Sequence, residues 1–279
     1  MSCRRSWLAL AAGAALALGA LAAGSSSGSS PRTVVRPGGV VRWQGAEVER
    51  CGRGEERWAP LDGGCYYPVD LLAPKGLITV SRWVGGKRED AAVTVGDYPY
   101  ETQRLKVDDR HVNLSPADLA RSERENAEVG KLFGLRTERR FRLPIAAPLA
   151  RLPAAGRFGA RRVFNGEPRN PHSGADYAAP TGTPVLATEA GKVVLSADHF
   201  FSGQSIFIDH GDGLVSMVFH LSKRLVATGQ VVARGQKIGE VGATGRATGA
   251  HLHFGLRWRG ARVDPALLLG DPAALAVIP

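Results

Sequence analysis

The sequence predicts a mainly β protein in which two β regions are joined by one helix. Residues 33–107 contain short runs of strand-forming side chains, separated by Gly and Pro turns. Residues 144–279 are also rich in glycine and in strand-like runs. Between them lies one segment with the capping pattern of a helix. We therefore expect a small N-terminal β domain, a helical connector over 108–143 and a larger C-terminal β domain over 144–279.

The N-terminal domain is predicted from three runs that are typical of strands. These runs are Val40–Trp43, Leu77–Val84 and Ala91–Val95. Turn-forming stretches such as Pro37-Gly38-Gly39 and Asp62-Gly63-Gly64 separate such runs. Short strands at this spacing favour a small β-sandwich-like domain over 33–107.

The connector contains the clearest helix signal in the chain. Ser115 is a suitable N-cap, Pro116 follows at the first helical position, and Asp118 stands in the first turn. We expect the helix to run to about Phe133 and to end at Gly134.

The C-terminal domain is expected to be built from antiparallel strands. Its candidate strands are Thr183–Thr188, Gly191–Ala197, Ser205–Asp209, Leu214–Leu221, Lys237–Val241 and His251–Trp258. The Gly211-Asp212-Gly213 turn predicts a hairpin between two of them. The apolar final stretch, Asp264–Pro279, is expected to pack back on the same domain.

The N-terminus has the layout of a secretory signal peptide. Arg4 and Arg5 precede an apolar run from Trp7 to Ala23, and small residues at its end fit a cleavage site. We expect a signal peptide over 1–23 and a polar tether over 24–32, which would place the protein beyond the inner membrane, in the periplasm or cell envelope. An uncleaved membrane anchor is the alternative; after cleavage no stable membrane span is expected.

Export would place the cysteines in an environment where disulfides form. Cleavage would leave Cys51 and Cys65, which we expect to form one disulfide. Two reduced structural thiols are the alternative. Neither cysteine has a Cys or His at the spacing of a zinc finger.

The positive charge suits an anionic partner. The formal net charge is +10 at pH 7, which is compatible with a cell-wall polymer, a nucleic acid or an anionic lipid surface. The export signal disfavours a nucleic acid, as does the lack of an aromatic–basic platform for single strands.

The candidate functional residues are concentrated in the last two-fifths of the chain. His251 and His253 are one residue apart in an apolar run, so on a strand they share one face while Leu252 and Phe254 take the other. Alone, a His-x-His pair is weak evidence, because it is also compatible with two histidines that have no function. The chain has only seven histidines in total.

A second group upstream strengthens the case for a metal site. His172 and Asp176 are separated by three residues, and Pro171, Gly174 and Pro180 argue against a helix there. We expect a loop that leads into an edge strand. A catalytic zinc usually takes three protein ligands and keeps one open position, so His172, Asp176 and one of the paired histidines would complete a set. An Asp–His hydrogen bond that caps a turn is the alternative.

His220 is a candidate for acid–base chemistry. It follows Ser216 and Val218 with strand periodicity, and the predicted hairpin could bring this face beside the His251 strand. A histidine near a metal that is not a ligand suits a general base or an electrostatic stabiliser. The Gly242–Gly249 loop enters the His251 strand directly and is expected to form a wall of the site.

Taken together, these motifs resemble the lysostaphin-type (LytM-domain) zinc metallopeptidases of bacterial cell walls. The motifs occur in the family's order: His172-x-x-x-Asp176, then Val218-Phe219-His220-Leu221-Ser222, then Thr248-Gly249-Ala250-His251-Leu252-His253-Phe254. The similarity covers about Phe158 to Leu269. Many family members have tyrosine at the position of Val218 and proline at that of Ala250, which puts groove shape and substrate preference in question.

The resemblance implies a fold and a mechanism. The fold is an antiparallel β metallopeptidase core with a groove. One zinc ion would be bound by His172, Asp176 and His253, with His220 and His251 as the catalytic histidines; the sequence does not say which is the general base. The implied substrate is a peptide cross-link or stem peptide of peptidoglycan. A non-catalytic cell-wall-binding or regulatory protein on the same fold is the alternative, and a contact between the N-terminal domain and the groove is a further expectation.

Overall fold

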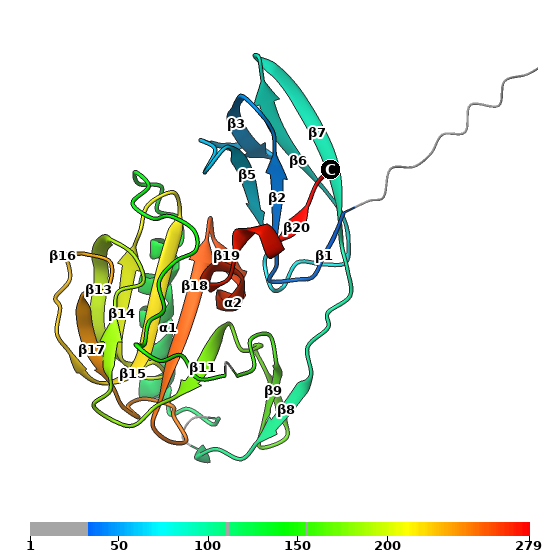
Figure 1. Cartoon of the computed structure of the whole chain (residues 1–279). Coiled ribbons are helices and arrows are strands. Elements are labelled where there is room, and N and C mark those ends of the chain that lie inside the picture. The colour runs from blue at the N-terminus through cyan, green and yellow to red at the C-terminus, as the bar shows by residue number, and fades with distance from the viewer. Residues whose placement is uncertain (1–32, 110–111, 155) are drawn as a thin grey trace, which may run out of the picture. The chain divides into compact units, whose positions relative to one another are not determined.

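One large antiparallel sheet organises the C-terminal part of the chain (Figure 1). The computed structural model describes residues 33–109, 112–154 and 156–279. The expected signal peptide and tether lie outside these residues. Within them, no helix is long and apolar enough to cross a membrane. The described residues from 33 onward belong to one compact unit.

The large sheet has nine strands, and every pairing in it is antiparallel. Its main order is β11-β18-β15-β14-β13-β16, with β17 joining β15 to β12 and with β19 beside β18. The strands are β11 (Gly174–Ala178), β12 (Pro184–Leu186), β13 (Gly191–His199), β14 (Gly203–Asp209), β15 (Leu214–Arg224), β16 (Val231–Val232), β17 (Lys237–Val241), β18 (His251–Trp258) and β19 (Ala261–Val263). The predicted strands and the β14–β15 hairpin are confirmed.

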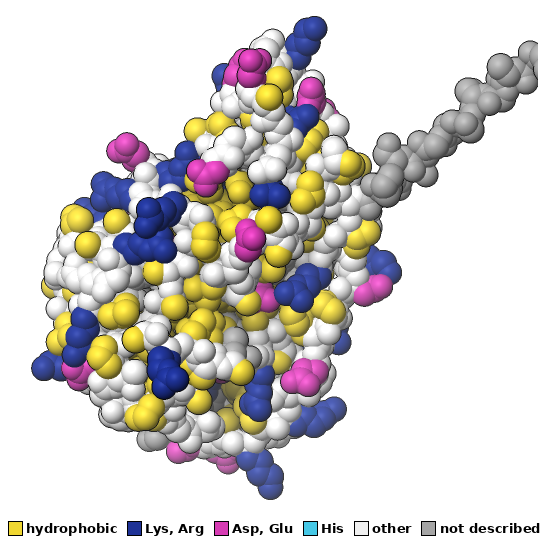
Figure 2. All heavy atoms as spheres, viewed as in Figure 1, with side chains coloured by type: hydrophobic (Ala, Val, Ile, Leu, Met, Phe, Trp, Pro, Cys, Tyr) yellow, Lys and Arg dark blue, Asp and Glu magenta, His cyan; other side chains and the backbone are white. Residues whose placement is uncertain are grey.

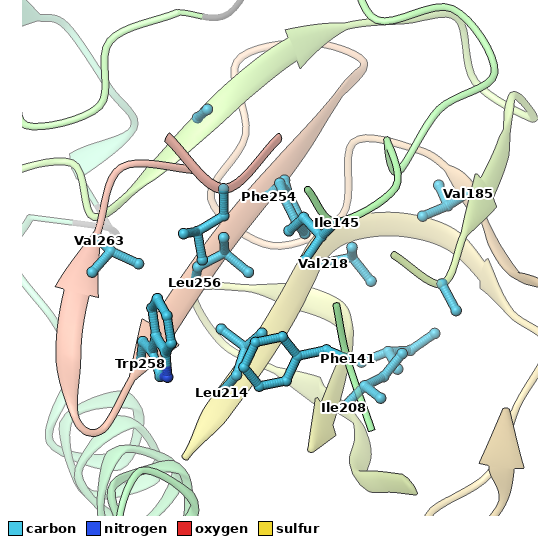
Figure 3. Close-up of a cluster of buried hydrophobic side chains, with 14 of the residues drawn as sticks. Phe141, Ile145, Val185, Ile208, Leu214, Val218, Phe254, Leu256, Trp258 and Val263 are labelled. Atoms are coloured by element: carbon cyan, nitrogen blue, oxygen red, sulfur yellow. The ribbon is translucent and has the colours of Figure 1, made fainter. Parts of the chain in front are cut away.

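The main hydrophobic core covers one face of this sheet. Val218, Phe254, Leu256 and Trp258 point into it from β15 and β18 (Figure 3). The short helix α2 (Pro265–Leu269) and the extended segment with Phe141, Ile145 and Leu149 close this core.

A smaller apolar cluster covers the opposite face, and helix α1 (Pro116–Leu132) packs on it. Residues Leu195, Phe207, Val215 and Met217 form the cluster, and Val129, Leu132 and Phe133 pack against them. The helix begins as predicted: the Ser115 Oγ accepts a hydrogen bond from the Asp118 backbone N–H at 3.1 Å. It ends at the C-cap Phe133.

The N-terminal region is a small two-sheet sandwich, which confirms the predicted class. One sheet has the order β1-β7-β6-β3-β4 and the other has β20-β2-β5. The strands are β1 (Val34–Val35), β2 (Val40–Gln44), β3 (Val48–Arg53), β4 (Glu56–Trp58), β5 (Gly64–Pro68), β6 (Gly76–Val84), β7 (Lys87–Val95) and β20 (Ala276–Val277). The disulfide Cys51–Cys65 joins β3 of one sheet to β5 of the other.

The C-terminal stretch differs from its expected position. Leu268 of α2 does enter the main core, but β20 pairs in parallel with β2 of the N-terminal sandwich. Ile278 then joins the sandwich core. A short 3-10 helix, η2 (Pro272–Ala274), precedes β20. The apolar composition predicted burial but not which core buries the residues.

A third, three-stranded sheet lies at the β11 end of the molecule (Figure 1). β8 (Thr102–Leu105) pairs in parallel with β9 (Arg161–Phe164), and β9 pairs with β10 (Glu167–Arg169). The segment between the sandwich and α1 thus adds a strand next to the segment that leads into His172.

Candidate active site

The pairing of β11 with β18 brings the two histidine motifs together. Asp176 lies directly opposite His253 in this antiparallel ladder. Leu252, Phe254 and Leu256 enter the main core, so His251 and His253 point to the opposite face of the sheet. This alternation confirms the prediction that the paired histidines share one face.

One nitrogen or oxygen atom from each of three side chains meets at one point on this face. The Nε2 atom of His172 lies 3.0 Å from Asp176 Oδ1 and 2.9 Å from His253 Nδ1. His253 Nδ1 lies 2.9 Å from the same carboxylate oxygen. Among the described residues, these three form the only group of at least three His, Cys, Asp or Glu that could hold a metal ion.

The backbone fixes which nitrogen of His172 faces this point. His172 Nδ1 lies 3.0 Å from the carbonyl oxygen of Arg157, which requires the proton on Nδ1 and leaves a lone pair on Nε2. Burial lowers the pKa of His172 to about 4, so the ring is neutral at neutral pH. A neutral imidazole is the form that binds a metal.

Asp176 supplies the negative charge. Burial raises the pKa of its carboxyl, but the contacts with the His172 and His253 nitrogens outweigh burial and hold that pKa well below its usual range. The side chain is therefore a carboxylate with two imidazole nitrogens aimed at one of its oxygens.

The donor set fits a zinc ion. A tetrahedral zinc with bonds of about 2.0–2.2 Å holds its ligand atoms roughly 3.3–3.5 Å apart, so the observed triangle needs to widen by only a few tenths of an ångström. Two imidazoles and one carboxylate are common zinc ligands. With these three donors, one position of a tetrahedral zinc would stay open.

The His253 ring is held on both sides. The Phe219 ring stacks on it with a centroid distance of 4.9 Å and an interplanar angle of 4°. On another side lies Gly174, where a Cβ atom would come within 2.6 Å of His253 Nε2 and of the Phe254 carbonyl oxygen. Glycine is required at this position because the ring and the neighbouring backbone occupy the space of a side chain.

His220 and His251 stand beside the cluster in matching orientations. His220 Nδ1 lies 2.8 Å from the Thr244 carbonyl oxygen and His251 Nδ1 lies 2.9 Å from that of Gly249. Both carbonyls belong to the loop that was predicted to form a wall. Each Nδ1 therefore carries the proton, and each Nε2 is left as an acceptor. The two ring centroids are 4.8 Å apart.

His220 reaches this position through a bulge in β15. Its φ is +63°, in the left-handed region that non-glycine residues rarely adopt. The β14 register shifts at the same place: Gln204 pairs with Leu221, whereas Ile206 pairs with Val218. The bulge turns the His220 ring toward His251, while Val218 enters the main core. The expectation that His220 shares a face with Val218 is therefore wrong, because regular alternation ends at the bulge.

Burial keeps His220 neutral. Desolvation, followed by the charge of His253, lowers its pKa to about 3. A neutral ring with a free Nε2 can accept a proton or, once protonated, donate a hydrogen bond. His251 is more open, with 20% of its side chain exposed.

Three contributors to this arrangement were not assigned a role from the sequence. Phe219 lies within the His220 motif but looks like an ordinary strand residue. The Arg157 carbonyl and the Arg162 side chain come from a segment without a recognisable pattern. An Arg162 nitrogen lies 3.4 Å from Asp176 Oδ2. Only the pairing of β9 with its neighbours and the position of the preceding loop bring these groups to the site.

Comparison with known proteins finds a family match over the segment that carries these residues. Residues 170–265 match the model of peptidase family M23. The curated peptidoglycan DD-endopeptidase ShyA of Vibrio cholerae is 46% identical over 107 residues, which is 38% of this chain and 25% of that protein. The DD-carboxypeptidase/endopeptidase Mpg of Neisseria meningitidis is 43% identical over 34% of this chain and 22% of that protein. The chain thus spans about a quarter of the length of these curated relatives.

One solved structure is similar over most of its length. It is a peptidase M23 from Pseudomonas aeruginosa with 33% sequence identity and a TM-score of 0.64. The similarity covers 84% of this chain and 94% of that chain. It therefore extends well beyond residues 170–265, and the chain belongs to peptidase family M23.

Proposed function

We propose that this protein is an exported, zinc-dependent endopeptidase that hydrolyses peptide cross-links or stem peptides of peptidoglycan. The observation that carries the proposal is the convergence of His172, Asp176 and His253 on one point, next to the free Nε2 atoms of His220 and His251. The names of ShyA and Mpg support peptidoglycan as the substrate, and the positive net charge suits an anionic polymer.

In this proposal His172, Asp176 and His253 hold the zinc ion. When bound, zinc polarises a carbonyl group and lowers the pKa of a coordinated water to near neutrality. The residues of this chain set up that chemistry. Arg157 fixes the tautomer of His172 through its carbonyl oxygen, and Phe219 fixes the plane of the His253 ring.

His220 and His251 are the proposed catalytic histidines. Their Nε2 atoms are acceptors because each Nδ1–H donates to a loop carbonyl. One of the pair can take the proton of the attacking water, and a protonated ring can donate a hydrogen bond to the oxygen that gains negative charge. The proton then passes to the amine that leaves. The backbone anchors keep both rings in place throughout.

The test is the release of muropeptides from purified peptidoglycan by the zinc-supplemented protein. The wild type should release new, shorter peptides. Asp176→Ala should lose both zinc and activity, because it removes the only carboxylate of the ligand set. His220→Ala should keep zinc and lose activity, and the exposed control Lys192→Ala should behave like the wild type.

Two other outcomes of this test would contradict the proposal. Binding of peptidoglycan without release of any peptide would favour the non-catalytic, wall-binding or regulatory alternative. Loss of zinc in His220→Ala would contradict the assigned roles, because this ring would then belong to the ligand set.

We also propose that the helical connector covers or directs the substrate face; the expected contact between the N-terminal domain and the groove stays a prediction. Helix α1 packs on the sheet face that carries His251 and His253, against Met217 and its neighbours. The Glu125 side chain of this helix accepts a hydrogen bond from the Phe200 backbone N–H at 2.8 Å. These contacts support a helix that limits access of a large substrate to one end of that face.

A further inference from the structure

Two arginine side chains from different elements lie near the Phe164 ring, and one of them contacts Asp176 of the histidine cluster. Arg162 of β9 places a guanidinium nitrogen 3.4 Å from Asp176 Oδ2. Its Cζ lies 6.0 Å from the centre of the Phe164 ring. Arg246, from the loop that anchors His220 and His251, places its Cζ 4.9 Å from the same ring and 4.3 Å from the Phe201 ring. Both guanidinium groups therefore lie near the Phe164 ring.

These positive charges are poorly balanced. Among the described residues, Arg246 forms no ion pair, and the ion pair of Arg162 is a long contact with a carboxylate already shared by two histidines. The Nε atom of Arg162 is buried without a hydrogen-bond partner. Burial, followed by the charge of Arg162, lowers the pKa of Arg246 to about 10. The Arg246 guanidinium is thus partly desolvated and has no carboxylate partner among the described residues.

A carboxylate is the anion that this arrangement suits. Guanidinium groups donate paired hydrogen bonds to carboxylate oxygens, and such charge-assisted bonds are stronger than neutral ones. Both side chains are partly exposed, so a ligand can reach them. Phe164, by contrast, is only 2% exposed, which leaves the cationic groups and not the ring facing solvent.

The location of Arg162 restricts which residue of a bound peptide can supply the carboxylate. Arg162 contacts Asp176, a proposed zinc ligand, so an anion bound by this arginine would lie close to the reacting bond. The residue on the carbonyl side of that bond has already used its carboxyl group in the amide. The residue that supplies the nitrogen can keep its own carboxyl group free, either at a chain end or at a cross-link made through a side-chain amine.

We propose that Arg162 and Arg246 bind a free carboxylate on the residue that supplies the nitrogen of the scissile bond. This inference rests on the proposed endopeptidase function. It makes the two arginines specificity-determining residues, which select substrates by charge next to the reacting bond rather than by side-chain shape.

The test uses two synthetic cross-linked peptides that differ in one group. In one peptide the carboxylate beside the cross-link nitrogen is free, and in the other it is a carboxamide. The wild type should cleave the carboxylate form with a kcat/KM about tenfold to a hundredfold higher, as expected for a charge-assisted hydrogen bond. In Arg162→Gln and Arg246→Gln this preference should disappear, so that each variant cleaves the two peptides with similar kcat/KM. Arg→Lys variants should keep part of the preference.

Arg161→Gln is the matched control. It lies next to Arg162 on the same strand, but its Cζ lies 4.6 Å from the centre of the Tyr98 ring, and it should leave the preference unchanged. The zinc content of each variant should equal that of the wild type. Calorimetry gives a second measurement that needs no turnover. Its ligand is the product that carries the released amine, prepared once with a free carboxylate and once with a carboxamide. The carboxylate form should bind more tightly than the carboxamide form to the wild type, and this difference should be absent in variants that lack either arginine.

Each negative result of these experiments leads to a different conclusion. Equal cleavage of both peptides by the wild type would overturn this inference and leave the proposed function intact. Loss of zinc, or an equal fall for both peptides in Arg162→Gln, would show that Arg162 only supports Asp176. If neither peptide is cleaved, the proposed function fails for these substrates, and the product-binding measurement alone decides the role of the arginines.

Discussion

At the scale of single residues, backbone conformation places the site as much as side-chain chemistry does. His220 occupies the left-handed region at a bulge, a conformation that costs of order 1–3 kcal/mol for a non-glycine residue. Hydrogen bonds to Ser202 and Thr244 hold it there. Its backbone N–H donates to the Ser202 carbonyl oxygen at 2.9 Å. Removing either contact should release the ring from the position in which its Nε2 faces the cluster.

Gly174→Ala should weaken zinc binding at least tenfold without removing a ligand. A Cβ atom would lie 2.6 Å from His253 Nε2 and 2.6 Å from the Phe254 carbonyl oxygen, so β11 and the His253 ring must move apart. Competition with a zinc chelator measures the affinity. Gly249→Ala is the control, because its Cβ would meet nothing within 4 Å. Equal zinc affinity in Gly174→Ala and the wild type would show that the ring has more room than the structure indicates.

At the scale of elements, the β14–β15 hairpin is secured by a buried histidine outside the site. His210 Nδ1 lies 2.9 Å from the Ala190 carbonyl oxygen, and its Nε2 lies 2.7 Å from Ser216 Oγ. The ring therefore donates to the segment before β13 and accepts from β15. Both bonds use the neutral ring, and His210 is 1% exposed.

Acid should destabilise this hairpin region through His210. Burial lowers the pKa of His210 to about 4, whereas the unfolded chain binds a proton near pH 6.5. Between these values the unfolded state holds more protons, so the free energy of unfolding falls as pH decreases from 6.5 to 4, by at most about 1.4 kcal/mol per pH unit.

Chemical denaturation at several pH values measures this effect. His210→Gln should be less stable than the wild type at pH 7, because it loses a fitted ring, yet its stability should decline less between pH 6.5 and 4. Parallel curves for the two proteins across this range would contradict the assignment, since other buried histidines are common to both.

At the scale of the whole molecule, the two β regions are connected at several points along the chain. β20 joins the C-terminus to β2, and β8 joins the segment after the sandwich to β9 (Figure 1). Arg262 and Asp70 form a further ion pair with a 2.8 Å contact. The face shown in Figure 2 carries Lys and Arg side chains that are spread out rather than gathered in one patch. On this face, a polyanion would therefore meet distributed positive charge.

Leu132→Asp should raise the hydrolysis of intact peptidoglycan severalfold if α1 covers the substrate face. Leu132 packs on the cluster of Leu195, Phe207, Val215 and Met217, and a carboxylate cannot remain there without a large desolvation cost. Hydrolysis of a short peptide should change less, because it needs less of that face. Leu119→Asp, on the same helix but 47% exposed, is the control. A lower melting temperature with no gain in peptidoglycan hydrolysis would assign α1 a structural role only.

The sequence by itself determined the class of the fold, the capped helix, most strands and the five residues proposed for the site. Local patterns suffice for the fold class, the helix and the strands, since alternation, caps and turn residues act over a few positions. The resemblance of three motifs to a known family pointed to the five site residues. Tertiary structure alone decided the bulge that turns His220, the roles of Phe219, Gly174 and Arg162, and the crossing of β20 to the sandwich. Each of these depends on strand register and on contacts between segments far apart in the chain, which no local pattern encodes.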